Sequence, residues 1–325
     1  MGHRYGQRSY GRTATDASIG SKRKSNDEAR VNDAGRAETP GRWAFAALLA
    51  GNIALSIGAM LVRLADTGPT ASAFWRMMLA APVLLFFAWR ETGGRLPPRP
   101  AMLIAAAAGI FFAFDLAAWH IGILQTKVAN ATLFGNCASL LLVIWGIFLT
   151  RTLPRGWQAL AIALAFAGSA LLMGQSYELS PDYLVGDLLS LLAGVLYTGY
   201  VILMQRVRGT IGPWSALSIA SLVCPPILLT TALVLGETVM PQNWTPLILL
   251  AMTSQIIGQG LMIWSLPRFT PLVIGLTLLI QPAIAALAGW LMFGELLGPV
   301  DLLGGLMVGA ALVLIRLPSR RAQPI

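Results

Sequence analysis

The hydrophobic pattern beyond residue 42 is a series of apolar runs of about 20 residues, the length that a helix needs to cross a bilayer. Short connectors separate the runs and carry turn residues, as in Thr67-Gly68-Pro69 and Ser180-Pro181-Asp182. The pattern predicts an all-α integral membrane protein with ten transmembrane helices and no soluble domain. The predicted spans lie near residues 43–62, 71–89, 101–124, 128–149, 156–174, 185–205, 213–235, 244–265, 271–293 and 299–316.

The composition agrees with a membrane protein. Hydrophobic residues make up 56% of the chain and charged residues 11%, with a mean hydropathy of +0.69, whereas soluble domains carry about 25% charged residues. Residues 1–42 are polar and of mixed charge, so we expect a disordered tail, and residues 317–325 form a second short tail. No secretory signal fits ahead of Trp43. Cys137 and Cys224 lie inside apolar runs, which predicts no disulfide framework, metal site or cofactor.

Basic residues are distributed unevenly between the connectors. With a cytoplasmic N-terminus, the inside segments hold twenty Lys and Arg residues and the outside loops hold two. Such an excess marks the cytoplasmic side of a membrane protein. Both termini are therefore predicted to be cytoplasmic. The same excess accounts for the net charge of +9 without a nucleic-acid partner.

A weak repeat divides the chain into halves. Residues 128–153 align without a gap on residues 271–296 at an offset of 143, which places Ser139 on Pro282. Each half holds five predicted spans, and an odd number makes the second copy cross the membrane in the opposite sense. Inverted repeats with a site at the midplane are a recurring design of transporters. We predict two five-helix repeats, residues 43–174 and 185–316, around a central cavity.

Several short motifs occur in a fixed order along the two halves. They are Phe74-Trp75-Arg76, Trp119-His120, the stretch from Thr126 to Thr132, Gly186-Asp187, Gln281-Pro282 and Gly294-Glu295. In this order the chain resembles the drug/metabolite transporter (DMT) superfamily, in the branch with two EamA domains. It departs from the family pattern at Ser139, where the first repeat usually has Pro, and at Arg151-Thr152, where it usually has Gly-Glu. The resemblance implies ten helices, alternating access and transport of small organic solutes across the bacterial inner membrane.

Polar and aromatic side chains recur on one face of six predicted spans, the first, third, fourth, sixth, eighth and ninth. We predict that these spans line the cavity, with the fifth and tenth as outer scaffold. An alternative for each amide is a hydrogen bond that ties two helices together, and for each tryptophan it is core packing. The candidate cavity residues are Asn52, Asp115, Trp119, Asn136, Tyr197, Tyr200, Gln255, Gln259, Trp264 and Gln281.

Asp115 is the central candidate, because a carboxylate costs roughly 2.5–3.5 kcal/mol in the middle of a membrane helix. It either pairs with Arg76 or binds an ammonium group or a proton, and Trp119 lies one turn along the same face. Arg76 itself can instead extend to the membrane surface. His120 is predicted to face a neighbouring helix, which makes a proton relay the minor alternative.

Pro282 and the pair of glycines at 305 and 309 each allow a structural or a functional interpretation. Pro282 frees a carbonyl near Leu278 and serves as an acceptor, a hinge or a plain kink. Gly305 and Gly309 form a GxxxG pair that favours helix packing or a dimer face, so the protein is a monomer or a homodimer.

The leading functional hypothesis is a secondary transporter, working as an exporter of small metabolites such as amino acids or amines, with proton coupling as an option. The alternative within the same fold is a drug or cation efflux carrier. A membrane-embedded lipid-modifying enzyme is the rival from another class, but the spans lack the clustered carboxylates, nucleophile with base, or metal ligands that such chemistry needs. A channel would show rings of charge or repeated filter sequences, and neither is evident.

Overall fold

A computed structural model describes residues 42–126, 131, 134–151, 153–154, 156–174, 181–293 and 298–315. In these ranges the chain is all-α, apart from an isolated bridge between Arg208 and Ile211. The predictions for the two tails, for Lys127–Asn130, for Thr132, for Thr152, for the loop 175–180 and for Gly294-Glu295 fall outside the described residues.

The described helices of the first half follow the predicted ranges closely, except that α6 begins at Cys137 and not near residue 128. They are α2 (Arg42–Leu64), α3 (Pro69–Thr92), α4 (Arg99–Gln125), α6 (Cys137–Thr150) and α7 (Gly156–Gly174). Pro69 stands in the first turn of α3, where its missing N–H costs no hydrogen bond. Gly93 ends α3 in the left-handed conformation with φ of 61°, which a residue with a side chain rarely adopts.

The second half contains more interruptions. Its elements are the short 3-10 turn Pro181–Tyr183, α8 (Leu184–Val207), α9 (Pro213–Val234), α10 (Thr245–Leu250), the π-helical segment η2 (Ala251–Gln259), α11 (Gly260–Ser265), the 3-10 turn Leu266–Arg268, α12 (Pro271–Leu278), α13 (Ile280–Phe293) and α14 (Pro299–Leu314). The eighth predicted span is therefore a composite of α10, η2 and α11. The hydrophobic pattern predicts a single helical span here, near residues 244–265, and does not show the interruption.

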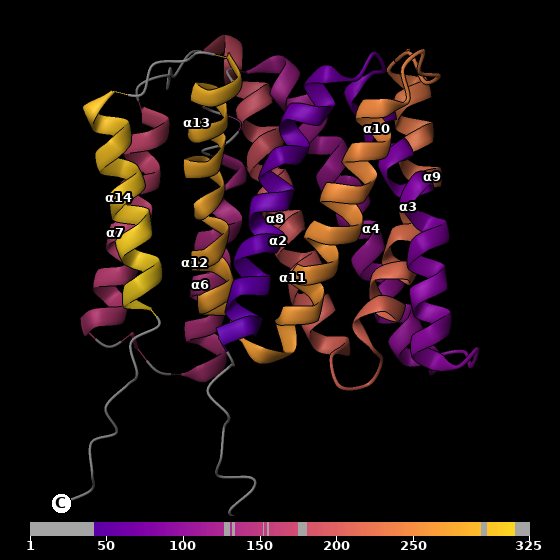
Figure 1. Ribbon diagram of the computed structural model, residues 1–325, viewed down its shortest axis with the longest axis horizontal. Helices are drawn as coiled ribbons and strands as arrows, with labels where there is room; N and C mark the ends of the chain where they lie inside the picture. Colours follow the sequence, from indigo (N-terminus) through magenta and orange to yellow (C-terminus); the bar gives the residue numbers. More distant parts are fainter. Residues whose placement is uncertain are drawn as a thin grey trace, which may run out of the picture. The chain divides into compact units, whose positions relative to one another are not determined.

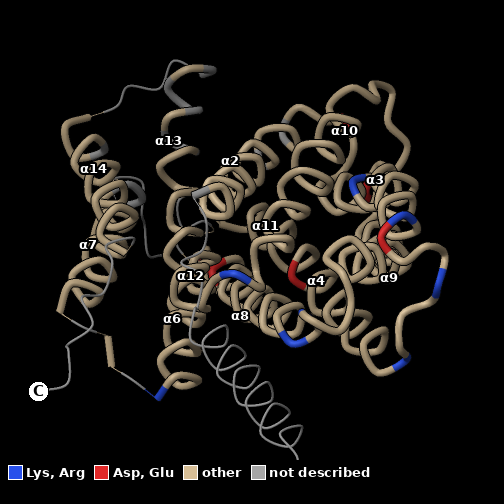
Figure 2. The backbone as a smooth tube through the Cα atoms, turned by 60° about the horizontal axis from the view of Figure 1, so that its bottom comes forward, with Lys and Arg blue, Asp and Glu red and all other residues tan. Residues whose placement is uncertain are grey.

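The helices divide into two groups by length and apolar character. Among the described residues, six segments are long and apolar enough to cross a membrane: Trp43–Val62, Pro69–Thr92, Arg99–Gln125, Pro181–Val207, Pro213–Val234 and Thr245–Arg268. Four shorter apolar helices in the described part of the chain cover Cys137–Thr150, Gly156–Leu171, Pro271–Ile284 and Leu302–Leu314. Long stretches of helix carry no charged residue (Figure 2), and large apolar side chains such as Phe148 and Leu306 are exposed on the outside. This surface is typical of a multi-pass membrane protein.

The helices pack in pairs that combine the two halves (Figure 1). At one edge α7 packs against α14, and α3 packs against α9 at the other. Between these edges α4 contacts α8, α2 contacts the composite segment α10–η2–α11, and α6 contacts α12. When each element is exchanged for its counterpart at an offset of 143, the pairs α7–α14 and α3–α9 are unchanged, and the α4–α8 pair becomes the pair of the composite segment with α2. The repeat seen in the sequence is thus present in the packing.

Two carboxylates tie α3 to α9 at opposite ends. Glu237, just beyond α9, accepts hydrogen bonds from the backbone N–H groups of Thr70 (3.2 Å) and Ala71 (2.8 Å) in the first turn of α3. Glu91, in the last turn of α3, accepts hydrogen bonds from the backbone N–H of Ser215 (2.8 Å) and from its hydroxyl (2.7 Å) in the first turn of α9. Each carboxylate therefore satisfies backbone donors at the positive end of the partner helix.

Small residues allow close approach in the outer pair α7–α14. A Cβ atom on Gly168 would lie 2.6 Å from the carbonyl oxygen of Gly304, so this contact needs glycine. The pair Gly305 and Gly309 does not contribute, since a Cβ on either residue would meet no described atom within 4 Å. Of the two alternatives for this GxxxG pair, packing within the chain finds no contact among the described atoms, and a dimer face stays a prediction. The glycine that fits this contact belongs to the fifth predicted span instead.

Candidate functional site

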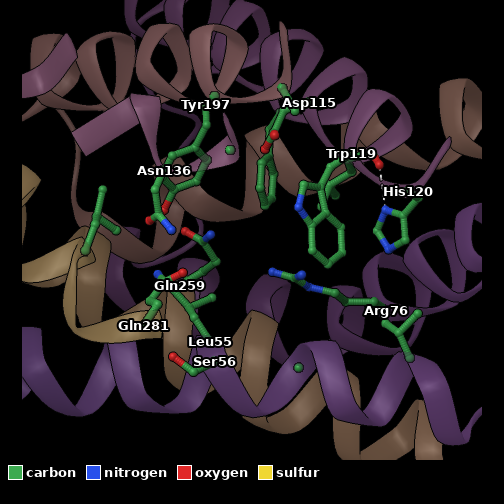
Figure 3. Close-up of a pocket in the computed structure, with 18 of the residues that line it drawn as sticks. Leu55, Ser56, Arg76, Asp115, Trp119, His120, Asn136, Tyr197, Gln259 and Gln281 are labelled. Atoms are coloured by element: carbon green, nitrogen blue, oxygen red, sulfur yellow. Dashed lines mark hydrogen bonds between the residues drawn. The ribbon is translucent and has the colours of Figure 1, made fainter. Parts of the chain in front are cut away.

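A cavity of about 230 Å³ lies between the two halves of the helical unit (Figure 3). Its walls come from α2, α3, α4, the residues around the start of α6, α8, the α10–η2 segment and the α12–α13 junction. The predicted lining spans one, three, four, six, eight and nine all contribute. The second span also contributes, through Arg76, although the polar pattern does not predict this span in the wall. Among the side chains that the structure describes, none from α7 or α14 lines the cavity.

Asp115 places a carboxyl group in this wall. It stands deep within the 27-residue helix α4 and is only 8% exposed. It has neither a hydrogen bond nor an ion pair with any other residue that the structure describes. Buried carboxylates in proteins are normally paired or hydrogen-bonded. An unpartnered one beside a cavity is therefore a candidate for binding a cation or a proton.

Arg76 lines the cavity from the opposite wall (Figure 3). Its Nε donates to Oε1 of Gln255 at 3.0 Å, and its guanidinium lies over the Phe112 ring, 5.7 Å from the centroid. Nη2 is buried and has no partner among the described atoms. The side chain thus points inward, and the suggestion that it extends to the membrane surface is not what the structure shows. It also forms no direct ion pair with Asp115 within the described residues.

His120 lines the cavity as well, whereas we had expected it to face a neighbouring helix. Its ring lies edge-on to that of Trp119, with centroids 5.1 Å apart. Nδ1 donates to the carbonyl oxygen of Leu116, which can only accept, so in the neutral ring Nε2 is an acceptor. This Nε2 is buried without a partner in the part of the chain that the structure describes. The expectation failed because the ring folds back along its own helix to reach Leu116.

The amide and phenol candidates fall into two layers. Asn136, Tyr197, Gln259 and Gln281 line the cavity, and the Tyr197 hydroxyl lies 3.1 Å from Sδ of Met262. Three other candidates are fully buried behind this layer and are not in the wall: Asn52, Tyr200 and Gln255.

Each residue of the second layer holds a lining residue in place. Asn52 Oδ1 accepts from Gln281 (3.1 Å), the Tyr200 hydroxyl donates to Gln259 (3.1 Å), and Gln255 accepts from Arg76. They were misassigned because a polar stripe identifies a helix face but cannot tell which of its residues reach open space.

The two predicted tryptophans have different positions. Trp119 lines the cavity and lies beside Gly135, where a Cβ would be in ordinary van der Waals contact with the ring at 3.6 Å. Trp264, near the end of α11, is not in the wall; its ring lies 3.7 Å from the guanidinium carbon of Arg268. Trp264 is therefore wrong as a cavity residue, because it stands more than one helical turn beyond Gln259 and packs against the basic end of its own segment.

Two helix breaks meet at the cavity. A turn at Asn136 precedes α6, and Leu279 separates α12 from α13. These residues are related by the offset of 143, so both repeats break at the same place. Pro282 is buried three residues beyond the second break, but the first repeat has Ser139 there and breaks without a proline. The break is therefore a property of the repeat and not of Pro282 alone.

The sequence reading missed two features of the wall. One is the π-helical segment η2, which carries Gln255 and Gln259; π-helical turns are rare and often occur at functional sites. The other is the set of small residues that makes room, including Gly194, where a Cβ would lie 2.7 Å from the carbonyl oxygen of Gly135. A glycine among larger apolar residues was the available signal for the second feature. The sequence held no signal for the first.

Comparisons with known proteins place this architecture in a family. A family model described as the EamA-like transporter family matches residues 42–174 and 184–317. A threonine/homoserine exporter, RhtA, of Escherichia coli is 29% identical over 154 residues, which cover 46% of this chain and 52% of that protein. An uncharacterized transporter of Archaeoglobus fulgidus is 25% identical over 152 residues, covering 45% of this chain and 50% of its own.

The chain thus spans about half the length of the curated relatives it matches. One crystal structure of another protein superposes with a TM-score of 0.68 at 17% identity, over 86% of this chain and 98% of that chain, which shows a shared fold. The family model covers both predicted repeats, and this match indicates a transporter rather than an enzyme. The chain therefore belongs to the EamA-like transporter family, within the drug/metabolite transporter type.

Proposed function

We propose that the protein is a secondary transporter that exports small organic solutes, amino acids or amines, by alternating access, and that Asp115 couples the transport to protons. One observation carries the proposal: a buried carboxyl group beside a cavity, without a partner among the described residues. Burial favours the neutral carboxyl group, whereas a bound cation favours the carboxylate. Proton and cationic solute therefore displace each other at one site, which is the chemistry that proton-driven antiport requires.

The architecture proposed around this site has ten spans, in two inverted repeats at residues 43–174 and 185–316. The matched helix breaks at Asn136 and Leu279 support it, as does the exchange of helix partners between the halves. The four shorter helices then complete spans four, five, nine and ten. The excess of basic residues supports cytoplasmic termini and insertion in the bacterial inner membrane.

The size of the cavity bears on the substrate. About 230 Å³ is less than the roughly 300–1,000 Å³ of sites for drug-sized ligands. This volume favours small metabolites over the alternative, a carrier of drugs or large cations. The name of the relative RhtA makes threonine and homoserine the first solutes to test.

Solute flux in proteoliposomes, with and without an imposed pH gradient, tests the proposal. Asp115→Asn keeps the size and a hydrogen-bonding group but removes the charge, so we expect folded protein that binds weakly and loses pH-driven flux. Trp119→Ala is expected to weaken binding and keep the dependence on pH. Asp66→Asn, in an exposed loop, is the matched control and should behave as the wild type. Full gradient-driven flux in Asp115→Asn would contradict the coupling role.

A further inference from the structure

The guanidinium of Arg76 is held in place but mostly unused. An arginine side chain offers five N–H donors, and in the described structure one of them, on Nε, has a protein acceptor, Oε1 of Gln255. The two terminal nitrogens make no hydrogen bond with a described residue, and Nη2 is buried as well. These two nitrogens are the pair that binds a carboxylate through two parallel hydrogen bonds.

Neighbouring side chains fix the orientation of the Arg76 guanidinium. Gln255 is fully buried and donates through Nε2 to the Ser221 hydroxyl at 2.8 Å, which directs its Oε1 toward Arg76. The Phe112 ring supports the guanidinium from one side. An arginine with a merely structural task would have its terminal nitrogens satisfied by protein acceptors, because an unpaired buried charge costs several kcal/mol. The arrangement is that of a donor prepared for an acceptor that arrives from outside the chain.

The cavity thus carries one positive and one negative group that reach it from different walls (Figure 3) and do not pair with each other in the described structure. A solute with only an ammonium group would compensate Asp115 and leave Arg76 unpaired in a closed site. A solute with only a carboxylate would leave Asp115 unpaired if it is ionised. A zwitterion compensates both groups at once.

We propose that Arg76 is the carboxylate-binding residue of the cavity, and that the transported solute is a small zwitterion whose ammonium group faces Asp115. This inference rests on the proposed transport function and narrows its substrate from amino acids or amines to amino acids. Gln259, Gln281 and Asn136 line the same cavity with amide groups and would contact the side chain of the solute. Within about 230 Å³ a single amino acid fits and a long peptide does not.

Matched ligand pairs test the proposal. The melting temperature of the purified full chain is measured with each protein amino acid and with the amine that results from its decarboxylation. We expect at least one amino acid to stabilise the wild type by mass action, and its amine to bind at least tenfold more weakly. If no amino acid stabilises the protein, or if an amine binds as tightly as its amino acid, the inference is overturned. Flux of the amines driven by a pH gradient would then still support the proposed transporter.

Variants of Arg76 separate binding from folding. Arg76→Gln should lose the preference for the amino acid over its amine while the ligand-free melting temperature stays close to that of the wild type. Arg76→Lys keeps the positive charge but cannot form two parallel hydrogen bonds to a carboxylate, so it should recover part of the preference. Arg90→Gln, at the exposed end of the same helix, is the control and should keep the full preference.

One outcome would identify a structural pair instead. If Arg76→Gln unfolds the protein and Asp115→Asn in the same chain restores the fold, the two residues depend on each other's charge, and the proposed carboxylate site is wrong. If Arg76→Gln is unfolded both alone and together with Asp115→Asn, the Arg76→Lys variant decides. A folded Arg76→Lys protein with the full preference for the amino acid over its amine overturns the bidentate site. A folded Arg76→Lys protein with a reduced preference supports it.

Discussion

The reciprocal carboxylates at the two ends of the α3–α9 pair lead to a quantitative prediction. Glu237→Ala removes the acceptor of two backbone N–H groups, those of Thr70 and Ala71, at 3.2 and 2.8 Å. Loss of a helix-capping side chain costs about 0.5–2 kcal/mol, and loss of a negative charge at a helix N-terminus costs about 0.3–1 kcal/mol. Because Glu237 is only partly exposed, we expect the free energy of unfolding to fall by about 1–2 kcal/mol.

The second carboxylate gives an internal comparison. Glu91 accepts from the backbone and hydroxyl of Ser215 but is exposed, so water replaces part of the lost bonding and Glu91→Ala should cost about 0.5–1.5 kcal/mol. The two sites lie at opposite ends of a helix of 24 residues, roughly 36 Å apart at 1.5 Å per residue. Effects at such a distance add. The double variant should therefore lose the sum of the two single losses.

Equilibrium unfolding in mixed detergent micelles, followed by tryptophan fluorescence, measures these losses. Glu237→Gln is the control, since it keeps one acceptor oxygen but not the charge, and it should fall between the wild type and Glu237→Ala. A change of less than about 0.3 kcal/mol in Glu237→Ala, which is within the usual error of additivity, would refute the claim that the cap stabilises the helix pair. A double variant well outside the sum would show that the two ends communicate.

Two further predictions follow from specific contacts. Gly168→Leu should lower the yield and the thermal stability of the folded protein because its Cβ would meet the Gly304 carbonyl at 2.6 Å, whereas Gly305→Leu, with no described atom within 4 Å, should have little effect on the monomer; equal losses in both variants, compared by size-exclusion chromatography, would contradict this packing. Asp66 is subject to a desolvation effect that raises its pKa, but hydrogen bonds from the backbone N–H groups of Asn243 and Gln242 outweigh it and lower the pKa below 3.8. Its contribution to holding this loop is therefore complete above pH 3.8 and is lost as the pH falls through the lowered value. The protection of these two amides from hydrogen exchange, taken relative to the intrinsic rate at each pH, should therefore fall there in the wild type and be equally low at higher pH in Asp66→Ala.

The amino-acid sequence alone determined the class of the protein and the ranges of its unbroken helices, such as α3, α4, α8 and α9. Apolar runs of membrane-spanning length leave a chain little choice but to form helices, because the bilayer offers no other partner for backbone N–H and C=O groups. The prolines of Gly68-Pro69 and Gly212-Pro213 mark helix starts because the first turn of a helix does not use the missing N–H of proline. The structure begins α3 and α9 at these prolines. The offset of 143 between the repeats was also readable, although it was weak as a sequence signal.

The tertiary structure decided which polar residues reach the cavity. A polar stripe does not show which of its residues reach open space. Gln281 and Arg76 line the cavity, whereas Asn52 and Gln255 lie behind them and hold them in place through hydrogen bonds. Arg76 turned inward because a distant residue, 179 positions along the chain, accepts its Nε–H. The break at Asn136 occurs without a proline, and the π-helical segment has no local signature. Such features arise from contacts between segments far apart in the sequence, and a periodic pattern within one helix contains no information about them.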